Sequence, residues 1–100
     1  MGQENELNGT TKNSTIAGGY QNTITGANYA FIGGGRNNVA SSTGAFIGGG
    51  QGNTASNINS SIVGGENNIV DSFYSNISGG KDNTIFISLQ IPMIFKWIRI

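Results

Sequence analysis

Residues 30–50 of this 100-residue chain read AFIGGGRNNVASSTGAFIGGG, and they contain one segment of six residues twice. Residues 30–35 return unchanged as residues 45–50, fifteen positions later. A glycine-rich loop that binds a phosphate is needed only once, and neither glycine triplet is followed by the Lys-Ser or Lys-Thr of a nucleotide-binding loop. The duplication therefore indicates a repeated structural unit.

A pair of glycines marks this unit five times along the chain, at intervals of 16, 15, 15 and 15 residues. The pairs are Gly18-Gly19, Gly34-Gly35, Gly49-Gly50, Gly64-Gly65 and Gly79-Gly80. Isoleucine stands two positions before each pair, at Ile16, Ile32, Ile47, Ile62 and Ile77. Asparagine stands three positions after each pair, at Asn22, Asn38, Asn53, Asn68 and Asn83. The unit is (S/A)-x-I-x-G-G-x-x-N-x-(I/V/A), and its five copies fill residues 14–85.

Apolar and polar residues alternate within each half of the unit, and this alternation predicts β-strands. The small-x-Ile and Asn-x-Ile segments have a period of two, so every second side chain faces inward. The glycine pair turns the chain between them, because glycine tolerates a positive φ. We therefore predict an all-β fold, a single-stranded parallel β-solenoid (β-roll) of five 15-residue coils stacked about 4.8 Å apart. The isoleucines form its core ladder, and the asparagine amides bond to the next coil or to the turn backbone.

Three regions are expected along the chain. Residues 1–13 are interpreted as a flexible polar N-terminal segment, 14–85 as the solenoid repeat domain and 86–100 as an apolar C-terminal cap or tail. In the last region, alternating apolar residues predict one more strand up to Pro92, and a cap would cover the open edge of the last coil. An interfacial anchor is the alternative. The region is too short and too charged for a transmembrane segment, which needs about 20 apolar residues, and the N-terminus lacks the apolar stretch of a signal peptide.

The composition argues against several functions. Five Lys and Arg balance five Asp and Glu, so the chain lacks the basic face that nucleic-acid binding needs. It has no Cys and no His, which removes thiol nucleophiles, Ser-His-Asp triads and the usual zinc ligands. The acids of the repeats, Glu66, Asp71 and Asp82, share no column, so no calcium site and no cofactor is expected. Glu66 and Asp82 lie in adjacent coils and could form a pair of carboxylates like that of a glycosidase. This pair is the enzymatic alternative to a non-catalytic protein. An ion pair with Lys81 explains Glu66 better.

Two outward-facing rows are candidate interfaces. The first strand of each coil presents Thr15, Phe31, Phe46, Ser61 and Asn76, in which the two phenylalanines form an exposed apolar patch. A partner or a flanking segment of the same chain would cover that patch. The second strand presents an uncharged row suited to a protein partner or to ice: Thr23, Val39, Thr54, Ile69 and Thr84. The irregular members of this surface, such as Val39 and Ile69, count against ice and for a protein partner. A third, polar row is expected to be a solvated turn: Tyr20, Arg36, Gln51, Glu66 and Lys81.

The stretch GGGRNNVASSTGAFIGGGQGNTAS resembles the head repeats of trimeric autotransporter adhesins and related repeats in phage and giant-virus fibre proteins. The resemblance covers residues 14–85. It implies a homotrimer of left-handed β-rolls with a structural or adhesive role in a surface or virion fibre, and an extracellular location at a cell surface or virion. Its partner would be a receptor or a glycan on a host surface. The absence of a neck, a stalk, a membrane barrel and an export signal favours a virion or phage fibre over an autotransporter, and it would equally suit a fragment of a longer fibre.

Aromatic residues in the turns are the expected receptor contacts: Tyr20, Tyr29, Phe73 and Tyr74. A second resemblance concerns residues 20–26, YQNTITG, which are similar to the x-x-N-x-V-x-G half-units of plant ice-binding β-rolls. Only one strand of each coil matches that pattern. Ice binding is therefore the alternative function.

Overall fold

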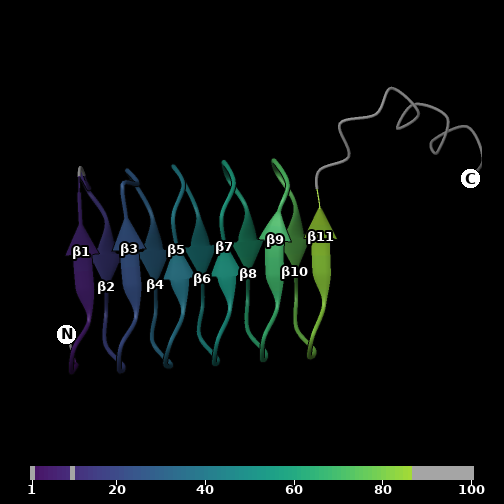
Figure 1. The fold of residues 1–100 in the computed structure, drawn as a ribbon, viewed down its shortest axis with the longest axis horizontal. Coiled ribbons are helices and arrows are strands. Elements are labelled where there is room, and N and C mark those ends of the chain that lie inside the picture. The colour runs from purple at the N-terminus through teal and green to yellow at the C-terminus, as the bar shows by residue number, and fades with distance from the viewer. Residues whose placement is uncertain (1, 10, 87–100) are drawn as a thin grey trace, which may run out of the picture.

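The chain forms a parallel β-solenoid in a computed structural model that describes residues 2–9 and 11–86 (Figure 1). Eleven short strands alternate between two stacks in this part of the chain, and no helix occurs in it. The strands are β1 (Glu6–Asn8), β2 (Thr15–Ile16), β3 (Thr23–Thr25), β4 (Phe31–Ile32), β5 (Val39–Ala40), β6 (Phe46–Ile47), β7 (Thr54–Ala55), β8 (Ser61–Ile62), β9 (Ile69–Asp71), β10 (Asn76–Ile77) and β11 (Thr84–Phe86). One sheet has the order β1-β3-β5-β7-β9-β11, and the other has the order β2-β4-β6-β8-β10. The predicted all-β solenoid fold is therefore confirmed.

Successive coils pair in the register of the repeat. β4 lies parallel to β6, with Phe31 opposite Phe46, and β5 lies parallel to β7, with Val39 opposite Thr54. The remaining strand pairs are parallel as well. Each column of the repeat therefore becomes a ladder of side chains along the stack of arrows in Figure 1.

The core lies between the two sheets and consists mainly of two columns, to which the buried Ala27, Ala30 and Ala45 add at the turns. From the five-stranded sheet, Ile32, Ile47 and Ile62 are fully buried, and the end members of their column are nearly so. The column from the six-stranded sheet packs in the same cluster and is also fully buried: Ile24, Ala40, Ala55 and Val70. Because burial of an isoleucine side chain contributes about 1.5–3 kcal/mol, each coil adds a similar increment to the stability of the stack.

The asparagine column is a buried hydrogen-bond ladder. The Oδ1 atom of Asn53 accepts the backbone N–H of Asn68, one coil further on, at 3.0 Å. Its Nδ2 donates to the carbonyl oxygen of Gly49 in the same coil at 3.0 Å and to that of Gly65 in the next coil at 3.1 Å. The amides of Asn22, Asn38 and Asn68 repeat these bonds. In the described residues, no buried side-chain polar atom lacks a hydrogen-bond partner, so burial of the asparagine amides leaves none of their polar atoms unsatisfied.

The two glycines of each pair differ in their structural role. The second glycine has a positive φ, as at Gly50 (97°), and a Cβ there would collide with the carbonyl oxygen of Gly65 in the next coil. The same holds for Gly19 and Gly35. The first glycine, as at Gly49, has no left-handed φ, and a Cβ on it would meet nothing within 4 Å. The turn and the close stacking of coils therefore require the second glycine only.

The solenoid begins earlier than the predicted boundary at residue 14. β1 pairs in parallel with β3, with Leu7 opposite Ile24, and the Oδ1 atom of Asn5 accepts the backbone N–H of Asn22 at 2.9 Å. Residues 2–7 read GQENEL and supply the second half of the unit, G-x-x-N-x-apolar. Sequence analysis missed this half-coil because it has no isoleucine half and because Gly2 stands 17 residues before Gly19, the glycine at the same position of the next coil. Part of the predicted flexible segment is thus an ordered extension of the ladder.

The other end of the described structure is β11. It pairs in parallel with β9, with Ile85 opposite Val70, and Ile85 packs against the core. The predicted continuation of this strand to Pro92 and the predicted C-terminal cap lie outside the described residues.

Candidate interaction surfaces

The two phenylalanines of the five-stranded sheet form a stacked pair on its outer face. The ring centroids of Phe31 and Phe46 lie 5.3 Å apart with an angle of 12° between the ring planes. The side chains remain 36% and 38% exposed. The rest of their row, Thr15, Ser61 and Asn76, carries no charge. This face is an apolar patch that the described residues leave accessible to a partner.

The first glycine of each triplet precedes the turn and lies beside this patch. A Cβ on Gly33 would collide with the carbonyl oxygen of Gly48 in the next coil, and one on Gly48 with that of Val63, whereas the rings of Phe31 and Phe46 would lie further away, at 3.2 and 3.5 Å. The coils that lack a phenylalanine in this row have another residue at the same position: Ala17, Val63 and Ser78. The triplets thus combine two roles, because the first glycine lets the backbone of the next coil approach closely beside a phenyl ring and the last glycine closes the turn. Sequence analysis assigned the triplets to the turn alone, although they occur only where phenylalanine precedes the isoleucine.

The outer face of the six-stranded sheet carries the uncharged row Thr23, Val39, Thr54, Ile69 and Thr84. Its members range from half-buried to exposed, with Ile69 at 38%. All five are β-branched, which is typical of strand surfaces. The neighbouring row includes Asp71, whose carboxylate accepts hydrogen bonds from Ser56 Oγ at 3.4 Å and Asn57 Nδ2 at 3.3 Å. This face is therefore regular and mostly neutral.

The turn aromatics occupy two separate edges of the solenoid. Tyr29, Phe73 and Tyr74 lie in the turns that lead into the five-stranded sheet, whereas Tyr20 follows a glycine pair at the opposite edge. Tyr29 and Tyr74 have positive φ values of 59° and 54° and are 66% and 77% exposed. They share a repeat column but stand three coils apart and do not pack together. The exposed Ile58 precedes Phe73 in its column.

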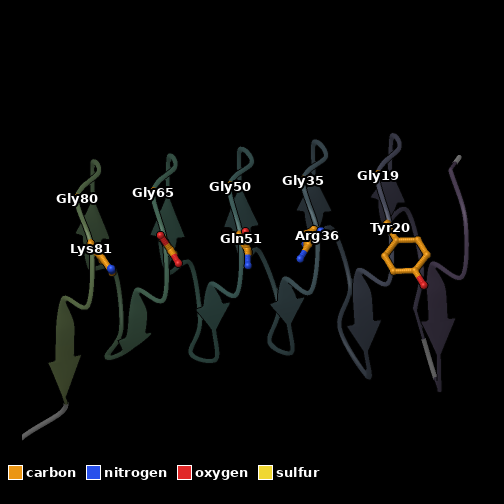
Figure 2. A pocket seen from close by; sticks show the side chains of 10 residues that line it. Gly19, Tyr20, Gly35, Arg36, Gly50, Gln51, Gly65, Gly80 and Lys81 are labelled. Carbon is orange, nitrogen blue, oxygen red and sulfur yellow. The ribbon is translucent and has the colours of Figure 1, made fainter.

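A shallow groove of about 770 Å³ runs along the edge at the glycine pairs (Figure 2). Its lining includes the exposed second glycines, which carry no side chain and are called here the glycine trough: Gly19, Gly35, Gly50, Gly65 and Gly80. The rest of the lining consists of the residues that follow them, called here the polar ridge: Tyr20, Arg36, Gln51, Glu66 and Lys81. The ridge residues pair by parallel β-bridges from one coil to the next, so their order along the edge is fixed. Figure 2 shows their side chains standing side by side along the groove.

The acid pair weighed as an enzymatic alternative lies at this edge. The backbone N–H of Asp82 donates to the carbonyl oxygen of Glu66 at 2.9 Å, so the two residues are in adjacent coils. Glu66 lines the groove, whereas Asp82 is exposed and has a positive φ of 59°. Among residues 2–9 and 11–86, no three acidic, His or Cys side chains gather into a group able to hold a metal ion.

Comparison with known protein families, curated proteins and solved structures found no match. The described residues include no helix long and apolar enough to cross a membrane. The fold itself defines the class, which is an all-β parallel solenoid built from a tandem repeat of about 15 residues.

Proposed function

We propose that this chain is a structural and adhesive segment of a surface or virion fibre, without a catalytic step. The observation that carries the proposal is the stacked and exposed pair Phe31 and Phe46 on an otherwise uncharged sheet face. An apolar patch of this kind on a repeat solenoid is suited to burial between copies of the chain. The fibre, located outside the cell on a surface or a virion, would present its turn residues to a receptor or glycan of a host.

The absence of charge from one row favours the association of three parallel chains in register. In such a trimer each side chain near the threefold axis meets its own two copies. The row Thr15, Phe31, Phe46, Ser61 and Asn76 has no charge, so like side chains can meet without repulsion, and six phenyl rings would form a common core. The polar ridge is unsuited to that position, because Arg36, Glu66 and Lys81 would each meet a like charge.

The repeat also supplies the stiffness that a fibre requires. Backbone hydrogen bonds link each coil to the next along both sheets, as from Phe46 N–H to the carbonyl oxygen of Ser60 at 2.9 Å. The asparagine ladder adds a second set of bonds inside the turns. Because each coil contacts mainly its neighbours, the stack behaves as a one-dimensional rod.

The molar mass in solution tests the proposal. We expect light scattering after gel filtration to give three times the 10.4 kDa of the chain. The double variant Phe31→Ser/Phe46→Ser is expected to abolish the trimeric species, whereas Tyr74→Ser, which removes an aromatic residue 77% exposed at another edge, leaves that species unchanged. A monomeric wild-type chain would overturn the trimeric fibre.

Ice binding is a second candidate, favoured by the regular row Thr23, Val39, Thr54, Ile69 and Thr84. Each member is β-branched and neutral, and adjacent members are about 4.8 Å apart. This function predicts thermal hysteresis that falls in Thr54→Lys and persists in Thr43→Lys, because Thr43 is an exposed turn residue outside the row. Absence of hysteresis in the wild-type chain would exclude this candidate.

A further inference from the structure

The groove at the glycine edge has a shape that a second copy of the same edge can fill. The polar ridge carries one side chain per coil, so its members stand about 4.8 Å apart. The glycine trough beside it runs over the same five coils and carries no side chains, and all five glycines are exposed. A second ridge with the same spacing can therefore lie in the trough. The chain itself provides such a ridge.

The order of residues in the ridge is complementary to its own reverse. In chain order it reads Tyr20, Arg36, Gln51, Glu66, Lys81. When a second copy runs in the opposite direction about Gln51, each Arg36 faces a Glu66 and each Lys81 faces a Tyr20. An arginine and a carboxylate form charge-assisted hydrogen bonds, and a lysine over a tyrosine ring forms a cation–π contact. The two Gln51 amides can donate to and accept from each other.

The parallel arrangement lacks this complementarity. Two ridges in the same direction and register would place Arg36 against Arg36, Glu66 against Glu66 and Lys81 against Lys81, and like charges in contact are unfavourable. In the described residues Glu66 and Lys81 both line the groove from adjacent coils and form no hydrogen bond with each other. Both charged groups are therefore available to a partner.

We propose that the groove is an antiparallel homotypic interface. A second copy of the chain, related by a twofold axis through Gln51, seats its polar ridge in the glycine trough and receives the partner ridge in return. The contact is isologous, so each Arg36–Glu66 and Tyr20–Lys81 pair occurs twice. The groove lies at the edge between the two sheets and leaves the Phe31/Phe46 face free. The inference therefore does not depend on the proposed trimer, and in a fibre it would join neighbouring trimers side by side.

Charge exchange in the full chain tests the pairing. Arg36→Glu alone or Glu66→Arg alone converts both ion pairs into repulsive contacts, so we expect the self-association constant measured by sedimentation equilibrium to fall at least about tenfold. The double variant Arg36→Glu/Glu66→Arg restores opposite charges across the interface and is expected to recover association to within about threefold. Failure of the double variant to recover, with both single variants impaired, would overturn the proposed pairing. The double variant Phe31→Ser/Phe46→Ser separates this association from the trimer, because it leaves the groove intact.

Cross-linking tests the direction of the two chains. The wild-type sequence has no cysteine, so single cysteines can be introduced without competing thiols. A short bis-maleimide is expected to link Gln51→Cys to itself and Tyr20→Cys to Lys81→Cys in a mixture, but not Tyr20→Cys to itself. Linkage of Tyr20→Cys to itself without the mixed product would overturn the antiparallel arrangement. The proposed homotypic interface would also be overturned by a second result. In that result, the groove variants leave the self-association unchanged, and the groove instead binds a linear polysaccharide such as alginate.

Discussion

Replacement of Asn53 by alanine tests whether the asparagine ladder holds successive coils together. The side chain is fully buried, and its amide bonds to Asn68, Gly49 and Gly65. Alanine removes all three bonds. The carbonyl oxygen of Gly65 keeps the backbone N–H of Gln51 as a donor at 3.0 Å. The backbone N–H of the buried Asn68 and the carbonyl oxygen of Gly49 lose the partner that the ladder gives them.

The expected loss of stability follows from these two groups. A buried donor left without a partner costs about 1–3 kcal/mol. The N–H of the fully buried Asn68 is such a group, whereas Gly49 is half-buried and its carbonyl oxygen can bond to water. We therefore expect the free energy of unfolding to fall by roughly 1–3 kcal/mol. A water molecule that enters the small cavity would place the loss at the lower end of this range. Even that value is a large share of the roughly 5–15 kcal/mol by which domains are stable.

Urea unfolding followed by circular dichroism measures this loss. The matched control is Asn76→Ala, because Asn76 is exposed and its Nδ2 donates only to Ser78 Oγ, at 3.2 Å. The control is expected to change the free energy of unfolding by no more than about 0.5 kcal/mol. Equal stability of the two variants would refute the reasoning, since the ladder would then contribute no more than a surface hydrogen bond.

Two further pairs of substitutions test the turn and the core. Gly50→Ala is expected to lower the melting temperature strongly, because the φ of 97° at this position is left-handed and a Cβ would collide with the next coil. Gly49→Ala is expected to raise the free energy of unfolding by about 0.4–1 kcal/mol, because a Cβ at this position would meet nothing within 4 Å. Equal melting temperatures would contradict this division of roles. Ile47→Ala is expected to cost about 2–5 kcal/mol in urea unfolding because Ile47 is fully buried, and Val63→Ala, at a position 53% exposed, serves as its near-neutral control. A small effect of Ile47→Ala would indicate that the core column is not continuous.

The fold could be predicted from the sequence because each stacked coil must present matching core side chains and hydrogen-bonding groups to both of its neighbours. Ile32 packs beside Ile47 only if the intervals are equal, and Asn38 bonds to Asn53 only if the turns match. These requirements impose identical residues at equal spacing, which is visible without coordinates. The side of the strand that each side chain faces could be predicted in the same way, because a period of two fixes which side chains point inward.

The structural features that could not be predicted from the sequence lie at repeat positions where the residue type varies from coil to coil. Tyr29 and Tyr74 occupy a left-handed turn position that the other coils fill with Asn13, Gly44 and Asn59, and tyrosine has no general preference for that conformation. The groove was also missed, because its ridge is variable along the chain and was read as a solvated turn. The variation within this column was the available signal for the groove. The order of its charges becomes complementary only when the column is set beside a second, reversed copy of itself.

The equality of the coils makes the length of the rod adjustable in whole steps. Phe31 lies opposite Phe46, and Phe46 lies opposite Ser61, so removal of residues 46–60 would bring Phe31 opposite Ser61 with every other column still in register. Insertion of one unit would lengthen the rod by about 4.8 Å with equally little disturbance. The identical segments at residues 30–35 and 45–50 are what a recent duplication of this kind would leave. A protein of this design can therefore change its reach during evolution without passing through a misfolded intermediate.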